Sequence, residues 1–165
     1  MPLLHLSNRQ RKSRIDLTEF RDFAEAAMAR IAQLVDTVAL PAEISVAFVS
    51  DARIAQIHLE FMSVAGPTDV ITFHHGEIVI SVETAVRQAK VFNSTLRREL
   101  RLYFVHGLLH LAGWDDSSRD GRQKMSTTQE RIIDEIDPMQ ASPQKSRAGL
   151  QQRVHCGQGF VSDAG

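Results

Sequence analysis

The chain has 165 residues and a mass of 18.5 kDa, a length typical of a single domain. Hydrophobic residues make up 43% of it and charged residues 24%, which excludes a collagen-like or wholly disordered chain. The formal net charge is −1, so any surface that attracts nucleic acid must come from local segregation of charge.

The first third of the chain predicts two helices and two strands. Residues 2–6 can supply a short strand at a sheet edge. From Asp16 to Val35, apolar residues recur at i, i+3, i+4 and i+7, which predicts an amphipathic helix. Alternation over residues 44–49 predicts a second strand, and Ser50 with Asp51 supplies the N-cap of a helix that extends to about Phe61.

The middle of the chain predicts a hairpin followed by three helices. Residues 69–74 and 77–81 are rich in β-branched side chains and flank a His75-Gly76 turn. Helical patterns then cover residues 82–91, 95–112 and about 117–136, where Pro138 ends the last. We therefore expect an α+β fold, with a mixed β-sheet of about four strands covered by helices.

The segment 138–165 is rich in Gln, Ser, Gly and Pro, which indicates a flexible tail outside a single domain of residues 1–137. Its Cys156 is the one cysteine, so an internal disulfide framework is excluded, and we assign it no role. The first residues lack the order of a signal peptide, and no apolar stretch reaches the roughly 20 residues that span a bilayer. We expect a cytoplasmic protein.

One cluster carries chemistry, and it lies on the 95–112 helix and the turn that follows. His106 and His110 are four residues apart, so a helix places both imidazoles on one face, where they can bind one metal ion. An HxxxH pair alone is weak evidence. Gly113 permits a turn, and Asp116 follows His110 by six residues, the spacing at which a third ligand returns to the same metal.

Two histidines and one carboxylate predict a catalytic rather than a structural zinc site, because a fourth coordination position stays open for water. The alternative is that the two histidines are ordinary helix residues and that Asp115 or Asp116 caps the next helix. Gly107 occupies the position of the general base in HExxH peptidases, so a zinc peptidase is disfavoured. Trp114 either stacks on a base or, as we favour, closes the core.

Other polar residues are weaker candidates. A cluster of five basic side chains can bind a phosphate backbone, although we favour a solvated helix face for it: Arg87, Lys90, Arg97, Arg98 and Arg101. His74 and His75 are expected to be turn residues rather than part of the metal pocket, and His58 is expected to pack against the core.

From Ile44 to Asp137 the sequence resembles the YbeY family of bacterial single-strand-specific endoribonucleases. Residues 106–115 match the family's HGxLHLxGYD with Trp114 in place of Tyr, and residues 67–73, PTDVITF, are similar to its PTDVLSF. The chain departs from the family at two positions. Asp116 stands in place of a third histidine, which zinc tolerates, and Met62 stands where many members have an arginine able to hold a phosphate.

The resemblance implies a single-strand-specific, metal-dependent endoribonuclease that acts in ribosomal RNA processing, at the 3′ end of the 16S rRNA of the small subunit, and in ribosome biogenesis. His106, His110 and Asp116 would bind one Zn²⁺ per chain, and Asp69 and Thr72 would orient the pocket. The expected partners are single-stranded ribosomal RNA and the small subunit or a ribosomal protein. The alternatives are a non-catalytic, zinc-containing ribosome-assembly factor and a zinc hydrolase of a small substrate.

Overall fold

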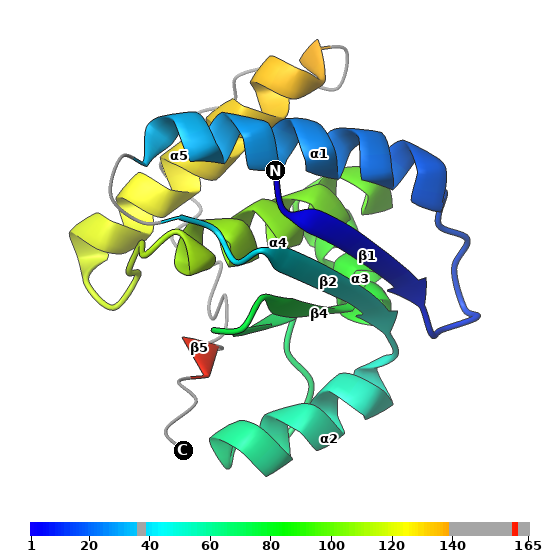
Figure 1. Cartoon of the computed structure of the whole chain (residues 1–165). Helices are drawn as coiled ribbons and strands as arrows, with labels where there is room; N and C mark the ends of the chain where they lie inside the picture. Colours follow the sequence, from blue (N-terminus) through cyan, green and yellow to red (C-terminus); the bar gives the residue numbers. More distant parts are fainter. Residues whose placement is uncertain (36–38, 139–159, 162–165) are drawn as a thin grey trace.

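The computed structural model describes residues 1–35, 39–138 and 160–161, whose centre is a mixed β-sheet with strand order β1-β2-β4-β3-β5 (Figure 1). The strands β1, β2 and β4 are parallel, and β3 is antiparallel to β4. Their bounds are Leu3–Asn8 (β1), Glu43–Val49 (β2), Val70–Phe73 (β3), Glu77–Ser81 (β4) and Phe160–Val161 (β5). The predicted α+β class with a mixed sheet is confirmed.

Five helices follow the predicted positions: Leu17–Leu34 (α1), Asp51–Met62 (α2), Val82–Val91 (α3), Leu96–Leu111 (α4) and Arg119–Ile136 (α5). Each begins after a side chain that accepts hydrogen bonds from the first turn, which satisfies amide groups that have no partner within the helix: Asp16, Ser50, Ser81, Thr95 and Ser118. No helix of the described residues is both long enough and apolar enough to cross a membrane.

The sheet is covered on both faces. Alternate residues of β2 and β4, such as Phe48 and Ile80, enter a main core with α1, α3, α4 and α5. The residues between them, such as Val79, enter a smaller core with α2, which lies on the opposite side of the sheet (Figure 1). Strands buried on both faces explain why residues 77–81 are apolar with little alternation.

The segment 138–165, expected to be a tail outside the domain, differs from that expectation at two residues. Phe160 and Val161 form β5, which pairs in parallel with Thr72 and Phe73 of β3. A pair of strands only two residues long is held by backbone hydrogen bonds, which do not require an apolar sequence pattern. The composition of the segment therefore did not predict β5. Cys156 and the other residues of 139–159 and 162–165 lie outside the described residues.

Helix α4 lies close against the sheet at Gly107. A Cβ atom at this position would lie 2.9 Å from Thr72 Oγ1 and 3.1 Å from Ile78 Cδ1, and both side chains are buried. The glycine therefore sets the distance between α4 and strands β3 and β4. It also leaves no room for the glutamate that a zinc peptidase would carry at this position.

We expect Gly107→Ala to lower the free energy of unfolding. Alanine gains up to about 1 kcal/mol in helix propensity, whereas an extra methyl group in a close-packed core typically costs about 1–3 kcal/mol. A net loss of up to about 2 kcal/mol should appear as a lower urea midpoint with an unchanged slope. A midpoint equal to or above that of the wild type would show that the helix and sheet separate at little cost.

Candidate metal centre

Helix α4 carries both histidines at its C-terminal end. The Thr95 hydroxyl accepts a hydrogen bond from the Arg98 amide and starts the helix, which is buried from Arg98 to its last residue. His106 and His110 are both buried, and their rings meet edge to face with centroids 4.6 Å apart. The spacing of four residues thus brings the two imidazoles together as predicted.

Gly113 turns the chain back toward the histidines. Its φ is +87°, in the left-handed region that favours glycine. The Trp114 amide donates to the Leu109 carbonyl at 3.0 Å and the Gly113 amide to the His110 carbonyl at 2.9 Å, a Schellman motif that satisfies the last carbonyl groups of α4. The reversal allows a residue in the following turn to approach the helix end.

The two aspartates of this turn have separate tasks. The Asp115 carboxylate accepts hydrogen bonds from the Ser117 amide at 2.9 Å and from the Ser117 hydroxyl at 2.5 Å, and these bonds hold its pKa below the ordinary value. Ser118 caps α5. Asp116 is therefore left to face the histidines, and the alternative in which it caps the next helix is wrong.

His106, His110 and Asp116 bring three donor atoms to one point. The Nε2 atoms of the two histidines are 3.0 Å apart, and Asp116 Oδ2 lies 3.5 Å from each of them. Zinc bonds of about 2.0–2.2 Å in tetrahedral geometry place neighbouring ligand atoms roughly 3.3–3.5 Å apart. The two separations of 3.5 Å agree with that value and the separation of 3.0 Å is a few tenths of an ångström shorter, so the donor set fits zinc.

The far nitrogen of each imidazole has an acceptor. His106 Nδ1 lies 3.2 Å from Oε1 of Gln129, and His110 Nδ1 lies 3.1 Å from the Trp114 carbonyl oxygen. Because both partners accept hydrogen bonds, a proton belongs on each Nδ1, which leaves Nε2 as the nitrogen that would bind a metal in place of its own proton. Such partners fix the tautomer and orientation that metal ligation needs.

Gln129 was missed by the sequence analysis. It lies on α5 and its side chain is 3% exposed. The signal was present, because Met125, Ile132 and Ile133 form the apolar stripe of this helix and Gln129 interrupts it. A buried amide on a core-facing stripe needs a partner, and only the folded structure identifies that partner as His106.

The carboxyl group of Asp116 favours its charged form. Burial by itself would raise its pKa, but the hydrogen bond and charge of His110, with the charge of His106, lower it below the ordinary value. The site therefore holds an anionic oxygen beside two imidazole nitrogens. That set suits a borderline divalent cation such as zinc.

The other two residues implied by the resemblance belong to β3 or adjoin its first residue. Thr72 is buried against Gly107, next to His106. Asp69 Oδ1 accepts hydrogen bonds from the Val70 amide at 2.8 Å and the Thr68 hydroxyl at 3.3 Å, where β3 begins.

Four other predicted positions have local roles. His74 and His75 lie in the turn between β3 and β4, as expected. His58 is buried, and its Nδ1 contacts the Gly66 carbonyl at 2.9 Å. Trp114 is half-buried against the main core, with the Lys124 ammonium 4.6 Å from its ring centroid, which agrees with a packing role.

In the basic cluster, Arg87, Lys90 and Arg97 are exposed as expected, but two arginines of α4 are not on a solvated face. Arg98 and Arg101 are only 4% and 3% exposed. Arg98 pairs with Glu130 at 2.5 Å and with Asp134 at 2.9 Å, both on α5. Helices α1 and α5 thus supply acidic partners that a single helical pattern cannot reveal.

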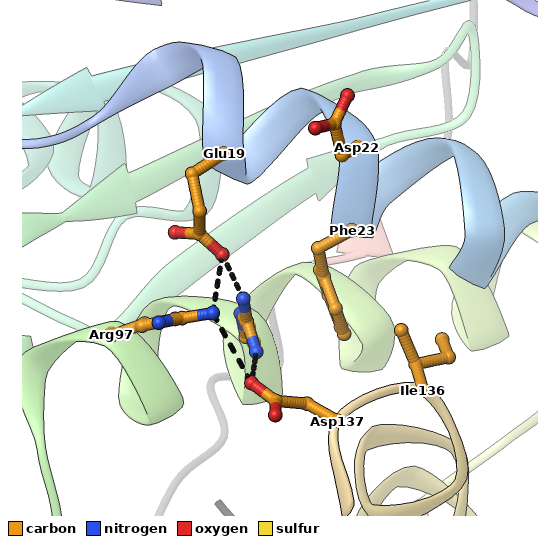
Figure 2. Close-up of a pocket in the computed structure, with 7 residues that line it drawn as sticks. Glu19, Asp22, Phe23, Arg97, Ile136 and Asp137 are labelled. Atoms are coloured by element: carbon orange, nitrogen blue, oxygen red, sulfur yellow. Dashed lines mark hydrogen bonds and ion pairs between the residues drawn. The ribbon is translucent and has the colours of Figure 1, made fainter. Parts of the chain in front are cut away.

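Figure 2 shows the second half of this network, where Arg97 lies between Glu19 of α1 and Asp137 after α5. Arg97 Nη2 is 2.9 Å from Glu19 Oε1 and 3.2 Å from Asp137 Oδ2. Arg101 pairs with the same two carboxylates. These arginines are therefore engaged in joining helices and do not replace the arginine missing at Met62.

Met62 itself is the last residue of α2 and packs, half-buried, against the smaller core. A thioether in contact with apolar side chains cannot bind a phosphate. Any stabilisation of phosphate charge must come from the metal or from other residues.

The fold and the three convergent donor atoms define an α+β protein with a candidate metal site at the end of a helix and the turn after it. A family model described as Endoribonuclease YbeY matches residues 5–137. The chain belongs to the YbeY family.

Three curated proteins named Endoribonuclease YbeY illustrate the similarity. The one from Heliobacterium modesticaldum is 35% identical over 112 residues, which cover 55% of this chain and 68% of the relative. The one from Moorella thermoacetica is 37% identical over 115 residues (58% and 74%), and that from Mycolicibacterium vanbaalenii 32% over 134 residues (68% and 73%).

The solution structure of TM1509 from Thermotoga maritima has the same fold. It aligns with a TM-score of 0.58 at 21% identity, over 87% of this chain and 98% of that one. At this identity the likeness concerns the fold alone.

Proposed function

We propose that this protein is a single-strand-specific, zinc-dependent endoribonuclease that acts in the cytoplasm on ribosomal RNA, in maturation of the small subunit. The observation that carries the proposal is the convergence of His106, His110 and Asp116 in a chain of the YbeY family. Three protein ligands leave a coordination position open, which distinguishes catalytic zinc sites from structural ones. The relatives' names support the endoribonuclease activity.

The chain's own residues would prepare the site as follows. Gln129 and the Trp114 carbonyl accept hydrogen bonds from the two Nδ1 atoms, which would leave both Nε2 atoms to bind the ion. Asp116 supplies a negative charge and a third ligand. A bound zinc ion supplies Lewis acidity and activates water for cleavage of a phosphodiester. Asp69 and Thr72 would support the pocket from β3.

The test is to measure zinc in the purified protein and its cleavage of a single-stranded ribosomal RNA precursor, with the same RNA in a duplex as comparison. We expect about one zinc per chain, cleavage of the single strand only, and loss of both zinc and cleavage in His110→Ala. The matched control is His75→Ala, an exposed turn histidine that should change neither. Zinc-loaded wild type that leaves single-stranded RNA intact would overturn the proposed activity.

The second candidate is a ribosome-assembly factor that binds RNA or a ribosomal protein and uses the metal only structurally. Met62, packed against the smaller core, favours it, because a thioether at this position cannot stabilise phosphate charge as an arginine would. His110→Ala expressed in cells that lack the protein separates the two functions. Restored small-subunit maturation by this variant would support the assembly factor, whereas a folded, ribosome-bound variant that fails would exclude it.

A further inference from the structure

The loop between β1 and α1 gathers basic side chains, and its one acidic residue is Asp16, whose carboxylate caps α1. Residues 1–15 contain no Asp or Glu. Four cationic side chains lie in this loop, and all are exposed: Arg9, Arg11, Lys12 and Arg14. The local charge contrasts with the net charge of −1 for the whole chain.

The side chain of Gln10 holds this loop in one shape. It is 7% exposed, although it lies between exposed arginines. Its Nε2 donates to Asn8 Oδ1 at 2.9 Å and to the Ser13 carbonyl at 2.8 Å, and its Oε1 accepts from the amides of Lys12 and Ser13 at 2.9 and 3.0 Å. A loop fixed in this way loses little entropy when it binds a ligand.

The loop is also joined to helix α3. Lys12 Nζ lies 2.9 Å from Glu83 Oε2, and Glu83 Oε1 accepts from the Asp51 amide at 3.1 Å. Lys12 therefore acts as an anchor that positions the loop over the start of α3. Its charge is already matched by a carboxylate, so it is not available to a ligand in the way that its neighbours are.

The guanidinium groups of Arg9, Arg11 and Arg14 are uncommitted. In the described part of the chain, none of them has a hydrogen-bond or ion-pair partner. Most other arginines there contact a carboxylate, an amide oxygen or a carbonyl group: Arg21, Arg30, Arg53, Arg87, Arg97, Arg98, Arg101, Arg122 and Arg131. Three unpaired guanidinium groups within six residues of an ordered loop form a site for an anionic ligand.

This loop lies at the opposite end of the sheet from the candidate metal centre. It follows the carboxyl end of β1, which is parallel to β2 and, through β2, to β4. Gly107, next to His106, packs over Ile78 near the amino end of β4. In Figure 1 this loop and the turn between α4 and α5, whose residues include Asp116, lie at opposite ends of the molecule, so a ligand that reaches both places must be long.

We infer that Arg9, Arg11 and Arg14 bind the phosphates of a single-stranded RNA that extends from the metal centre across the molecule. A polymer with one phosphate per nucleotide matches three free guanidinium groups and the distance to the metal centre. The choice of RNA as the ligand rests on the proposed function, whereas the observation that the three arginines are unpaired is independent of it. The loop would contribute affinity without sequence preference.

The test compares two triple variants with the same change of charge. Arg9→Gln, Arg11→Gln and Arg14→Gln are combined in one protein. The control combines Arg21→Gln, Arg53→Gln and Arg131→Gln, one half-buried and two exposed arginines on α1, α2 and α5 that already have partners. Binding of a labelled, unstructured uridine-rich RNA is measured by fluorescence anisotropy at several salt concentrations, with the integrity of the RNA checked on a gel.

We expect the loop variant to bind at least about tenfold more weakly at low salt. Its slope of log K against log salt should be smaller by about 2, since each lost phosphate contact to a single strand is worth roughly 0.7. Its zinc content should be unchanged. The control should keep nearly the wild-type slope.

Two outcomes would overturn the inference: a loop variant with wild-type slope, or an equal loss in the control, which would show an effect of net charge alone. Either result leaves the proposed function intact if the wild type still binds and cleaves RNA. If the wild-type protein does not bind single-stranded RNA at low salt, both the inference and the proposed function are overturned.

Discussion

Asp116→Ala should lose its metal and its RNA cleavage together while remaining folded. Removing the carboxylate takes away one of three ligands and the only negative charge among them. Loss of an outer partner of a metal ligand typically costs about 10–100-fold in affinity, so loss of a ligand itself should cost more than 100-fold. Zinc affinity is measured by competition with a chelator of known strength, and cleavage is measured on the same preparation.

The neighbouring aspartate is the matched control. Asp115→Ala removes a carboxylate one residue away, but that carboxylate accepts its hydrogen bonds from Ser117. We expect this variant to keep its zinc and to melt at a lower temperature, because the turn before α5 loses its support. Zinc affinity that falls equally in both variants would show that the turn, rather than Asp116 as a ligand, determines metal binding.

Gln129→Leu should weaken zinc binding about 10–100-fold, the usual cost of removing the partner of a ligating histidine. Leucine fills a similar volume but cannot accept the hydrogen bond from His106 Nδ1. The ring then loses the interaction that keeps its Nε2 available to the metal. Nitrogen NMR of the metal-free protein should show a mixture of His106 tautomers in place of the Nδ1-protonated form.

Two further variants distinguish loss of the hydrogen bond that orients His106 from a general disturbance of α5. Gln129→Glu retains an acceptor and should keep the Nδ1-protonated tautomer and most of the zinc affinity. Gln123→Leu makes the same change at an exposed position of the same helix and should change neither. If Gln129→Glu loses as much affinity as Gln129→Leu, the hydrogen bond to His106 is not what orients the ligand.

Local sequence determined most of the elements and the grouping of the candidate ligands. Helical periodicity and capping side chains placed five helices, because both act between residues a few positions apart. The same locality explains His106, His110 and Asp116, since one turn of helix and one glycine-dependent reversal bring them together. The backbone path that brings them together lies within residues 106–116, whereas the orientation of the His106 ring depends on Gln129.

The tertiary structure decided whatever depends on residues far apart in the chain. Gln129 reaches His106 only because α5 packs on α4, and the arginines of α4 are neutralised only because α1 and α5 bring carboxylates to them. The β5 pairing and the close approach at Gly107 likewise depend on distant partners. Periodicity shows which side of an element is buried, but the identity of the group that meets it depends on how the elements pack.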